Sequence, residues 1–333
     1  MRWRVVGLGG RRKAVVVMLF PEFQGHLVRR LPTAEELNRR PSCSITPRDL
    51  DILVAAGVHG LLTADLVGLA FFPPDRADPR HASSRAYARL QRCWLWGYLD
   101  RYVLPAPRGT HGGVPDLFAL GSEGLRLVVR RDVRTVAPAK RRVDELDVHF
   151  VHHELTVATL WAHLQALVRT GRLRSCRWTP ERAWRAADLR FPDASGGSLR
   201  VLPDGYAELG YGDGTVRGCA VEIDRCTLSG ERFRRKLRAW ERYVGGGQLA
   251  RDRGHQDSSF VVVTASWERL RELWKAGRQD IPQEGWGRYL FGTTEVLSPE
   301  RFGMEAAWLS LDGEYRPLLA GLLPGTNVIE KGN

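Results

Sequence analysis

The sequence predicts an α/β protein with two folded units, a small helical unit ending in a two-strand hairpin and an α/β sandwich around a mixed sheet. Helix start signals, each followed by apolar residues at helical spacing, recur over residues 46–97. From residue 149 the pattern becomes a helix, a group of short strands, a helix, a strand, a helix and a last strand. With 333 residues, 43% of them hydrophobic, the chain is long enough to bury two cores.

Three helices are predicted in the first unit. Thr46 caps the first of them, and Pro47 occupies its first turn. The second begins at Thr63 and stops at Pro73, and the third runs over about 83–97. Apolar spacing predicts that the third helix buries one stripe, made of Ala86, Leu90, Cys93, Trp94 and Gly97.

The third helix also presents a basic face. Its arginines recur at i, i+4 and i+7, beside the apolar stripe, and two predicted strands follow at residues 98–103 and 117–120. A basic helix followed by a two-strand wing is typical of a winged helix-turn-helix that enters the major groove. The alternative is a solvated arginine face on an ordinary helical bundle. The predicted DNA contacts are Arg85, Arg89, Arg92, Ser84 and Arg101.

The second unit is expected to begin with a helix over 151–168. Strands are predicted near 172–178, 199–202, 206–209, 216–224, 260–264 and 289–293, with further helices over 230–244 and 266–276. The whole chain is therefore divided into a basic N-terminal extension (1–42), a winged-helix DNA-binding domain (43–130), a linker (131–148), an α/β domain (149–310) and a C-terminal tail (311–333). Within the extension, Ala14–Phe20 has the pattern of a strand.

The charge balance favours a polyanionic partner. There are 50 Lys and Arg against 38 Asp and Glu, a formal net charge of +12, and most of the positive charge is arginine. The arginine fork suits phosphate oxygens, so duplex DNA is the expected partner. A GC-rich genome could also produce this composition.

Targeting and membrane segments are not expected. The apolar run at 14–20 is too short for a signal peptide, and no segment approaches the roughly 20 apolar residues of a membrane span. Five cysteines without a CxxC pair indicate reduced thiols. We expect a cytoplasmic protein with no membrane partner.

Carboxylates cluster on one predicted strand. Alternation over 216–224 places Glu222 and Asp224 on one face, and Asp204 lies at a turn beside the preceding strand. Asp204 and Glu222 could hold Mg²⁺ or Mn²⁺, with Lys236 reaching over the sheet from the next helix. Alternatively, Asp204 caps a turn, an acid of the strand pairs with Arg225, and Lys236 points outward.

A zinc site is a further, weaker hypothesis. It would use the histidines at helical spacing within or near the helix over 151–168, which are His149, His152, His153 and His163. A polar helical face with one buried histidine explains the same spacing.

Several segments together resemble the replication-relaxation family of bacterial plasmids and integrative elements. They span about residues 45–245 and are Thr46–Leu50, Trp96–Leu99, His149–Glu154, Pro203–Gly205, Glu222–Thr227 and Lys236–Leu237. The resemblance implies a role in plasmid replication and DNA relaxation.

The C-terminal half also resembles the restriction-endonuclease-like, or PD-(D/E)XK, fold. That pattern has an aspartate near one strand and Glu-x-Lys on the next. Asp204 and Glu222 match the two acids, but Asp224 stands where the lysine belongs. The resemblance implies Asp204, Glu222, Asp224 and Lys236 as catalytic residues if Lys236 replaces the missing lysine, and a degenerate, DNA-binding domain if it does not.

These observations predict a DNA-binding protein of plasmid or mobile-element replication, with a degenerate nuclease-like domain. Replication or mobilisation proteins, or a second copy of the chain, are possible partners. The alternatives are an active Mg²⁺-dependent endonuclease or nickase, a dimeric transcriptional repressor, and a scaffold whose charge is incidental.

Overall fold

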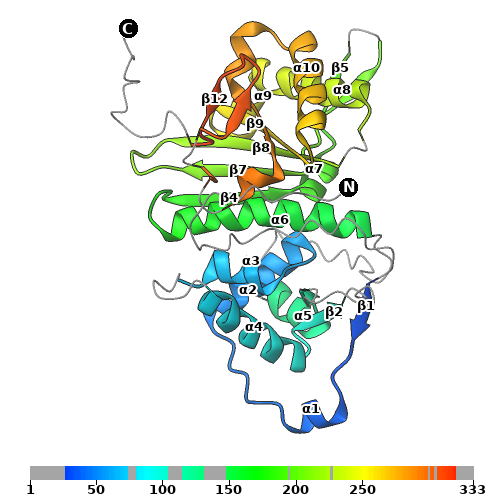
Figure 1. The fold of residues 1–333 in the computed structure, drawn as a ribbon, viewed down its shortest axis with the longest axis vertical. Helices are drawn as coiled ribbons and strands as arrows, with labels where there is room; N and C mark the ends of the chain where they lie inside the picture. Colours follow the sequence, from blue (N-terminus) through cyan, green and yellow to red (C-terminus); the bar gives the residue numbers. More distant parts are fainter. Residues whose placement is uncertain are drawn as a thin grey trace, which may run out of the picture.

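The long helix α6 (Val148–Arg169) crosses the middle of the molecule, with the N-terminal elements on one side and a large sheet on the other (Figure 1). The computed structural model describes residues 27–73, 80–103, 115–130, 148–193, 196–225, 228–298, 301–303 and 306–319. The predicted strand at Ala14–Phe20, the turn of the predicted wing and residues 131–147 of the predicted linker lie outside these stretches. Among the helices described, none combines the length and apolar character needed to cross a bilayer.

The N-terminal half contains five helices in its described stretches. They are α1 (Ala34–Asn38), α2 (Pro47–His59), α3 (Ala64–Phe71), α4 (Arg80–Leu95) and α5 (Ser122–Arg130). The predicted capping of α2 is confirmed, since Thr46 and Asp49 form a reciprocal capping box. The predicted stripe of α4 is buried at Ala86, Leu90, Cys93 and Trp94, whereas Gly97 lies in the turn after the helix.

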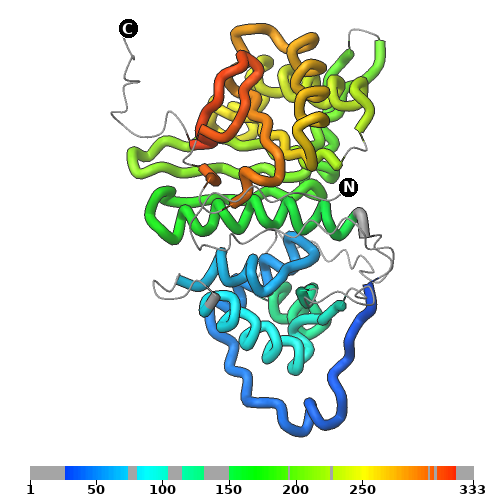
Figure 2. The backbone as a smooth tube through the Cα atoms, viewed as in Figure 1, coloured from blue at the N-terminus to red at the C-terminus, as the bar shows by residue number. Residues whose placement is uncertain are grey.

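A three-stranded antiparallel sheet completes this half. Its strands are β1 (Val28–Arg30), β2 (Leu99–Val103) and β3 (Leu117–Leu120), in that order. β1 belongs to the segment predicted as an extension, and it pairs with β2 along its whole length. Between α2 and α3, Leu62 forms a β-bridge with Phe118 of β3. Figure 2 shows the chain leaving β1 in a long loop that carries α1 and returns to α2.

The C-terminal half is built on a seven-stranded sheet, which is mixed, as the sequence predicts. Its order is β12 (Tyr315–Arg316), β11 (Trp308–Ser310), β10 (Tyr289–Thr293), β9 (Ser258–Thr264), β8 (Val216–Asp224), β7 (Gly205–Gly210) and β4 (Ser175–Pro180). Strands β8, β9 and β10 are parallel, and the other neighbours are antiparallel. β12 belongs to the segment predicted as a tail.

The remaining elements surround this sheet. They are α7 (Glu181–Ala187), the hairpin of β5 (Arg190–Pro192) and β6 (Ser198–Arg200), α8 (Gly230–Gly245), α9 (Gln248–Arg253), α10 (Trp267–Asp280) and the 3₁₀ helices η2 (Gln283–Arg288) and η3 (Thr294–Leu297).

Alternation along β8 assigns its side chains to two faces, as predicted. Cys219, Val221 and Ile223 belong to the apolar cluster that contains α6. Ala220 belongs to a second cluster with residues of α8 and α10. The sheet is thus covered by α6 on one face and by α8 and α10 on the other. Glu222 and Asp224 share the face of Ala220 and therefore lie under α8 and α10.

One apolar cluster extends through both halves. It includes Leu53 of α2, Val67 of α3 and Leu90 of α4, and it continues through Leu160 of α6 to Val261 of β9. All five side chains are fully buried. The N-terminal helices therefore pack on α6 as closely as the sheet does, and α6 is shared between the two halves.

Candidate functional site

The three arginines predicted to contact DNA lie along α4 in different surroundings. Arg85 and Arg92 are exposed, and Arg85 Nη2 donates to the carbonyl of Pro73 at 2.9 Å. Arg89 is largely enclosed, and its Nε donates to Oδ1 of Asp49 at 2.5 Å, with a second bond from Nη2 to Oδ2. Asp49 is 1% exposed. Arg89 therefore links α4 to the first turn of α2, while Arg85 and Arg92 face solvent.

The two other predicted contacts also differ. Ser84 is exposed on α4. Arg101 of β2 is only 7% exposed, and its Nη2 donates to Asp116 at 2.6 Å and to the hydroxyl of Tyr87 at 3.2 Å. Contrary to the sequence interpretation, Arg101 is not presented on the surface, because its guanidinium is enclosed between Asp116 and the ring of Trp94, which lies 5.1 Å away.

A hollow of about 330 Å³ opens between the start of α2 and α4. The guanidinium of Arg48 lies over the ring of Phe72 at 4.7 Å, and that of Arg85 lies over it at 5.9 Å. Four arginines and one aspartate line the hollow, and the aspartate is already bound by one of them, which leaves three positive charges in excess. These charged residues are Arg48, Arg85, Arg89, Arg92 and Asp49.

On the other side of α6, strand pairing brings the two predicted acids to one end of the sheet. Asp204 immediately precedes β7, and its backbone N–H donates to the carbonyl of Val221 on β8 at 2.9 Å. The carboxylate of Asp204 in turn accepts from the N–H of Ile223 at 2.7 Å. Glu222 lies between these two residues and is 2% exposed.

Two basic side chains bind these acids. Lys236, from the second turn of α8, donates through Nζ to both carboxylate oxygens of Glu222, at 2.5 and 2.6 Å. His153, from the first turns of α6, places Nε2 3.1 Å from Oδ2 of Asp204. Two acids and two bases from four separate segments thus form one partly buried cluster, which we call the acid cluster (Asp204, Glu222, Lys236 and His153).

The charged groups of the acid cluster shift one another's pKa values. Burial, together with the carboxylate of Asp204, raises the pKa of Glu222 to about 7, and Lys236 acts against this rise. Burial would raise the pKa of Asp204, but the hydrogen bond from His153 and the charge of Lys236 hold it below its usual value. Burial would lower the pKa of His153, but the nearby carboxylates of Asp204, at 3.1 Å, and Glu154, at 3.8 Å, raise it to about 10.

Asp224, the third predicted acid, is not part of this cluster. Its Oδ2 accepts from Nε of Arg269 on α10 at 2.6 Å, and its side chain is fully buried. The position where the PD-(D/E)XK pattern has lysine is thus occupied by a carboxylate bound to α10.

The acid cluster does not have the donor arrangement that a divalent cation needs. Both oxygens of Glu222 are bound by Lys236, and one oxygen of Asp204 accepts from His153 and from a backbone N–H. Within the described stretches, no three His, Cys, Asp or Glu side chains are grouped to hold a metal ion. A Mg²⁺ or Mn²⁺ ion would need at least the oxygens of Glu222 to be released.

The histidines of the zinc hypothesis are spread apart. His153 belongs to the acid cluster, while His163 stacks on Phe302 with ring centroids 4.8 Å apart. The side chain of His149 lies outside the described part of the chain.

The family model for replication-relaxation matches residues 55–258, more than half of the chain. The chain belongs to the replication-relaxation family. The matched region begins within α2 and ends at the start of β9, so it contains α4, all of α6 and the acid cluster. Neither a curated protein nor a solved structure matches this member of the family significantly.

His153 is the site residue that the sequence interpretation did not select. Local spacing offers it only as one of four histidines for zinc, because its partner Asp204 is 51 positions further along the chain. The segment containing it, His149–Glu154, was one of those carrying the resemblance to the replication-relaxation family. That resemblance was the signal that could have identified it.

Proposed function

We propose that this member of the replication-relaxation family binds duplex DNA in the replication of a plasmid or mobile element. The observation that carries the proposal is the basic hollow on α4, with three positive charges in excess. Arg48, Arg85 and Arg92 are exposed around it, so their guanidinium groups are available to phosphate oxygens.

The arrangement of the N-terminal half supports a winged helix. Three helices, α2, α3 and α4, precede the antiparallel pair β2 and β3, and the Leu62–Phe118 bridge adds a short third pairing next to α3. In such a unit the third helix reads the major groove and the hairpin forms the wing. α4 is that helix here, and it is anchored by its buried stripe and by the Arg89–Asp49 ion pair.

The C-terminal half supports a nuclease-like fold that binds without cleaving. The order of its elements agrees with the PD-(D/E)XK resemblance: α6 is followed by the antiparallel strands β4, β7 and β8, then by α8 and the parallel strand β9. The positions of Asp204 and Glu222 agree with that resemblance as well. The acid cluster is closed by Lys236 and His153, and Asp224 replaces the lysine of the strand. We infer a degenerate site.

DNA binding is tested by the variant Arg85→Ala/Arg92→Ala. The log–log salt slope of duplex binding should fall by about 1.8, since each lost phosphate contact removes about 0.9. A matched control, Arg126→Ala/Arg130→Ala, removes two exposed arginines from α5 in the same half and should retain the wild-type slope. Equal slopes for wild type and the α4 variant would refute a DNA contact at α4.

A divalent-metal nuclease is the second candidate, because Asp204, Glu222 and Lys236 do lie together. A nicking assay on supercoiled plasmid, with and without Mg²⁺, separates the two candidates. A degenerate site predicts no cleavage above that of the Asp204→Ala variant. Mg²⁺-dependent nicking that Asp204→Ala abolishes would establish the second candidate instead.

A further inference from the structure

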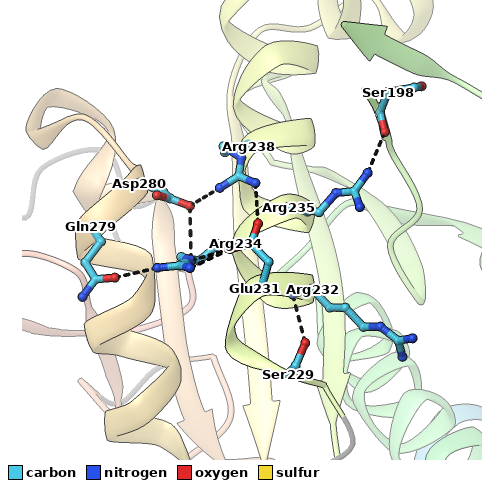
Figure 3. Close-up of polar contacts among 9 residues, drawn as sticks. All are labelled: Ser198, Ser229, Glu231, Arg232, Arg234, Arg235, Arg238, Gln279 and Asp280. Atoms are coloured by element: carbon cyan, nitrogen blue, oxygen red, sulfur yellow. Dashed lines mark hydrogen bonds and ion pairs between the residues drawn. The ribbon is translucent and has the colours of Figure 1, made fainter. Parts of the chain in front are cut away.

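Helix α8 carries basic side chains on two sides, and the two sides have different partners. On the side of α10, Arg234 donates to Gln279 at 2.9 Å, and Arg238 donates to Asp280 at 2.6 Å (Figure 3). Glu231, in the first turn of α8, accepts from both of these arginines. The arginines on this side therefore link α8 to α10, and they also bind Glu231 of the same helix.

The arginines on the other side are exposed and have no such partner. Arg232 and Arg235 both face solvent, and Figure 3 shows them directed away from α10. Arg235 Nη2 donates to the backbone carbonyl of Ser198 in β6 at 3.0 Å. In the part of the chain that the structure describes, neither arginine forms an ion pair with an acid. Their charges are therefore not neutralised by neighbouring side chains.

This surface lies next to the acid cluster. Arg232 is four residues before Lys236 on α8, so the two side chains lie on the same side of the helix, one turn apart. Lys236 binds Glu222. A ligand lying along the surface formed by Arg232 and Arg235 would therefore pass beside Lys236, at the edge of the acid cluster.

The arginines of the neighbouring hairpin are balanced by its own acids. β6, which Arg235 contacts through Ser198, pairs with β5. Asp188, just before this hairpin, is bound by two arginines at once, Arg190 and Arg200, each at 2.9 Å. Asp193, directly after β5, supplies a second carboxylate, so residues 188–200 carry no net charge and the excess positive charge of this surface comes from Arg232 and Arg235.

We infer that Arg232 and Arg235 of α8 form a second contact surface for the nucleic-acid backbone, separate from α4 and beside the acid cluster. The inference rests on the proposed DNA binding and adds the surface through which the C-terminal half takes part in it. Arginine forks match phosphate oxygens in geometry and charge, and exposed arginines without acid partners are the kind of group that backbone binding uses. Contacts of this kind position the nucleic acid and do not select a sequence.

The test is duplex binding by the full-length variant Arg232→Ala/Arg235→Ala over a series of salt concentrations. Its matched control is Arg271→Ala/Lys275→Ala, which removes the same charge from exposed positions on α10. The α8 variant should bind all duplexes more weakly, and its log–log salt slope should fall by about 1.8 below that of the wild type. The control should keep the wild-type slope. Both variants should melt at the wild-type temperature, since the four side chains are exposed.

The outcomes separate this inference from the proposed function. If the α8 variant binds like the wild type while Arg85→Ala/Arg92→Ala is weakened, α4 binds DNA and the α8 surface does not. If the α8 variant and its α10 control are weakened equally, the effect comes from total charge, and the inference is overturned. If the wild type binds no duplex, both the inference and the proposed function are wrong.

Discussion

Arg89 lies on the basic face of α4, but its side chain stabilises the packing of the protein and is not free to bind a ligand. It donates to Asp49 and to the carbonyl of Ser44, so it holds α4 against both α2 and the segment before it. Asp49 also accepts from the N–H and the hydroxyl of Thr46, at 2.6 and 2.5 Å. This carboxylate is buried and charged, and it depends on Arg89 for its counter-charge.

We predict that Arg89→Ala destabilises the protein much more than Arg92→Ala does. Removing one partner of a buried ion pair leaves an uncompensated charge, at a cost of about 3 kcal/mol or more. Arg92 is exposed, so its loss should change the free energy of unfolding by less than about 0.5 kcal/mol. Urea denaturation measures both. Similar stabilities for the two variants would show that Asp49 does not need this partner.

The pKa of His153 predicts a pH dependence of stability. Because the folded-state pKa is raised from 6.5 to about 10, the stabilisation is complete below pH 6.5 and is lost as pH rises through 10. Between pH 7 and 10 the free energy of unfolding should therefore fall, by up to about 1.4 kcal/mol per pH unit from this group. His153→Gln should be less stable than the wild type at pH 7 and should lose less stability over this range.

The control for this experiment is His81→Gln, an exposed histidine on α4. It should show the same fall in stability between pH 7 and 10 as the wild type. Parallel curves for His153→Gln and the wild type would mean that the ion pair with Asp204 does not contribute to stability.

The pairing of β4 with β7 depends on a residue without a side chain. Gly205 begins β7 next to Asp204, and a Cβ atom there would lie 2.1 Å from Cζ2 of Trp178 on β4. Trp178 is almost completely buried, so its rigid ring has little space to move away. The glycine therefore determines how closely the two strands can approach beside the acid cluster.

We predict that Gly205→Ala destabilises the protein by about 1–3 kcal/mol, the usual cost of overpacking. Gly212→Ala, in the turn between β7 and β8, is the matched control, because nothing lies within 4 Å of its added Cβ. Its effect should stay within about 0.5 kcal/mol. Thermal unfolding followed by circular dichroism compares the two variants. If the Gly205 variant is as stable as this control, the close contact with Trp178 is not structurally important.

The shared core determines how the whole molecule should unfold. α6 supplies Leu160 and Leu164, both fully buried, to the apolar cluster that also contains residues of α2, α3 and α4. An interface of this kind resembles the interior of one domain more than a contact between two domains. The two halves should therefore unfold together.

We predict a single cooperative transition, with coincident curves from tryptophan fluorescence and far-ultraviolet circular dichroism. Leu164→Ala should lower the free energy of unfolding by about 2–5 kcal/mol without separating the two curves. Leu37→Ala, at a partly exposed position on α1, should have a much smaller effect. Two separate transitions in the wild type would show that the halves are independent domains.

Local sequence patterns were sufficient to predict most of the long helices and strands. The strands Leu117–Leu120, Val216–Asp224 and Tyr289–Thr293 have the predicted bounds, because alternation or a continuous apolar run marks a strand within its own residues. α5 and β11 were not predicted. Short apolar runs do not distinguish a helix from a strand, and a strand of three residues exists only through its pairing partner.

The mixed α/β class, the buried stripe of α4 and the face of β8 that carries Glu222 all follow from periodicity along single elements, so they could be predicted before the fold was known. Which charged groups meet depends instead on the packing of elements that are distant in the chain. Asp49 and Arg89 are 40 residues apart, and His153 and Asp204 are 51 apart. No local pattern specifies such pairs, since they depend on how α2, α4, α6 and β8 pack. That packing assigned Arg89 to the fold and left Arg85 and Arg92 exposed at the surface.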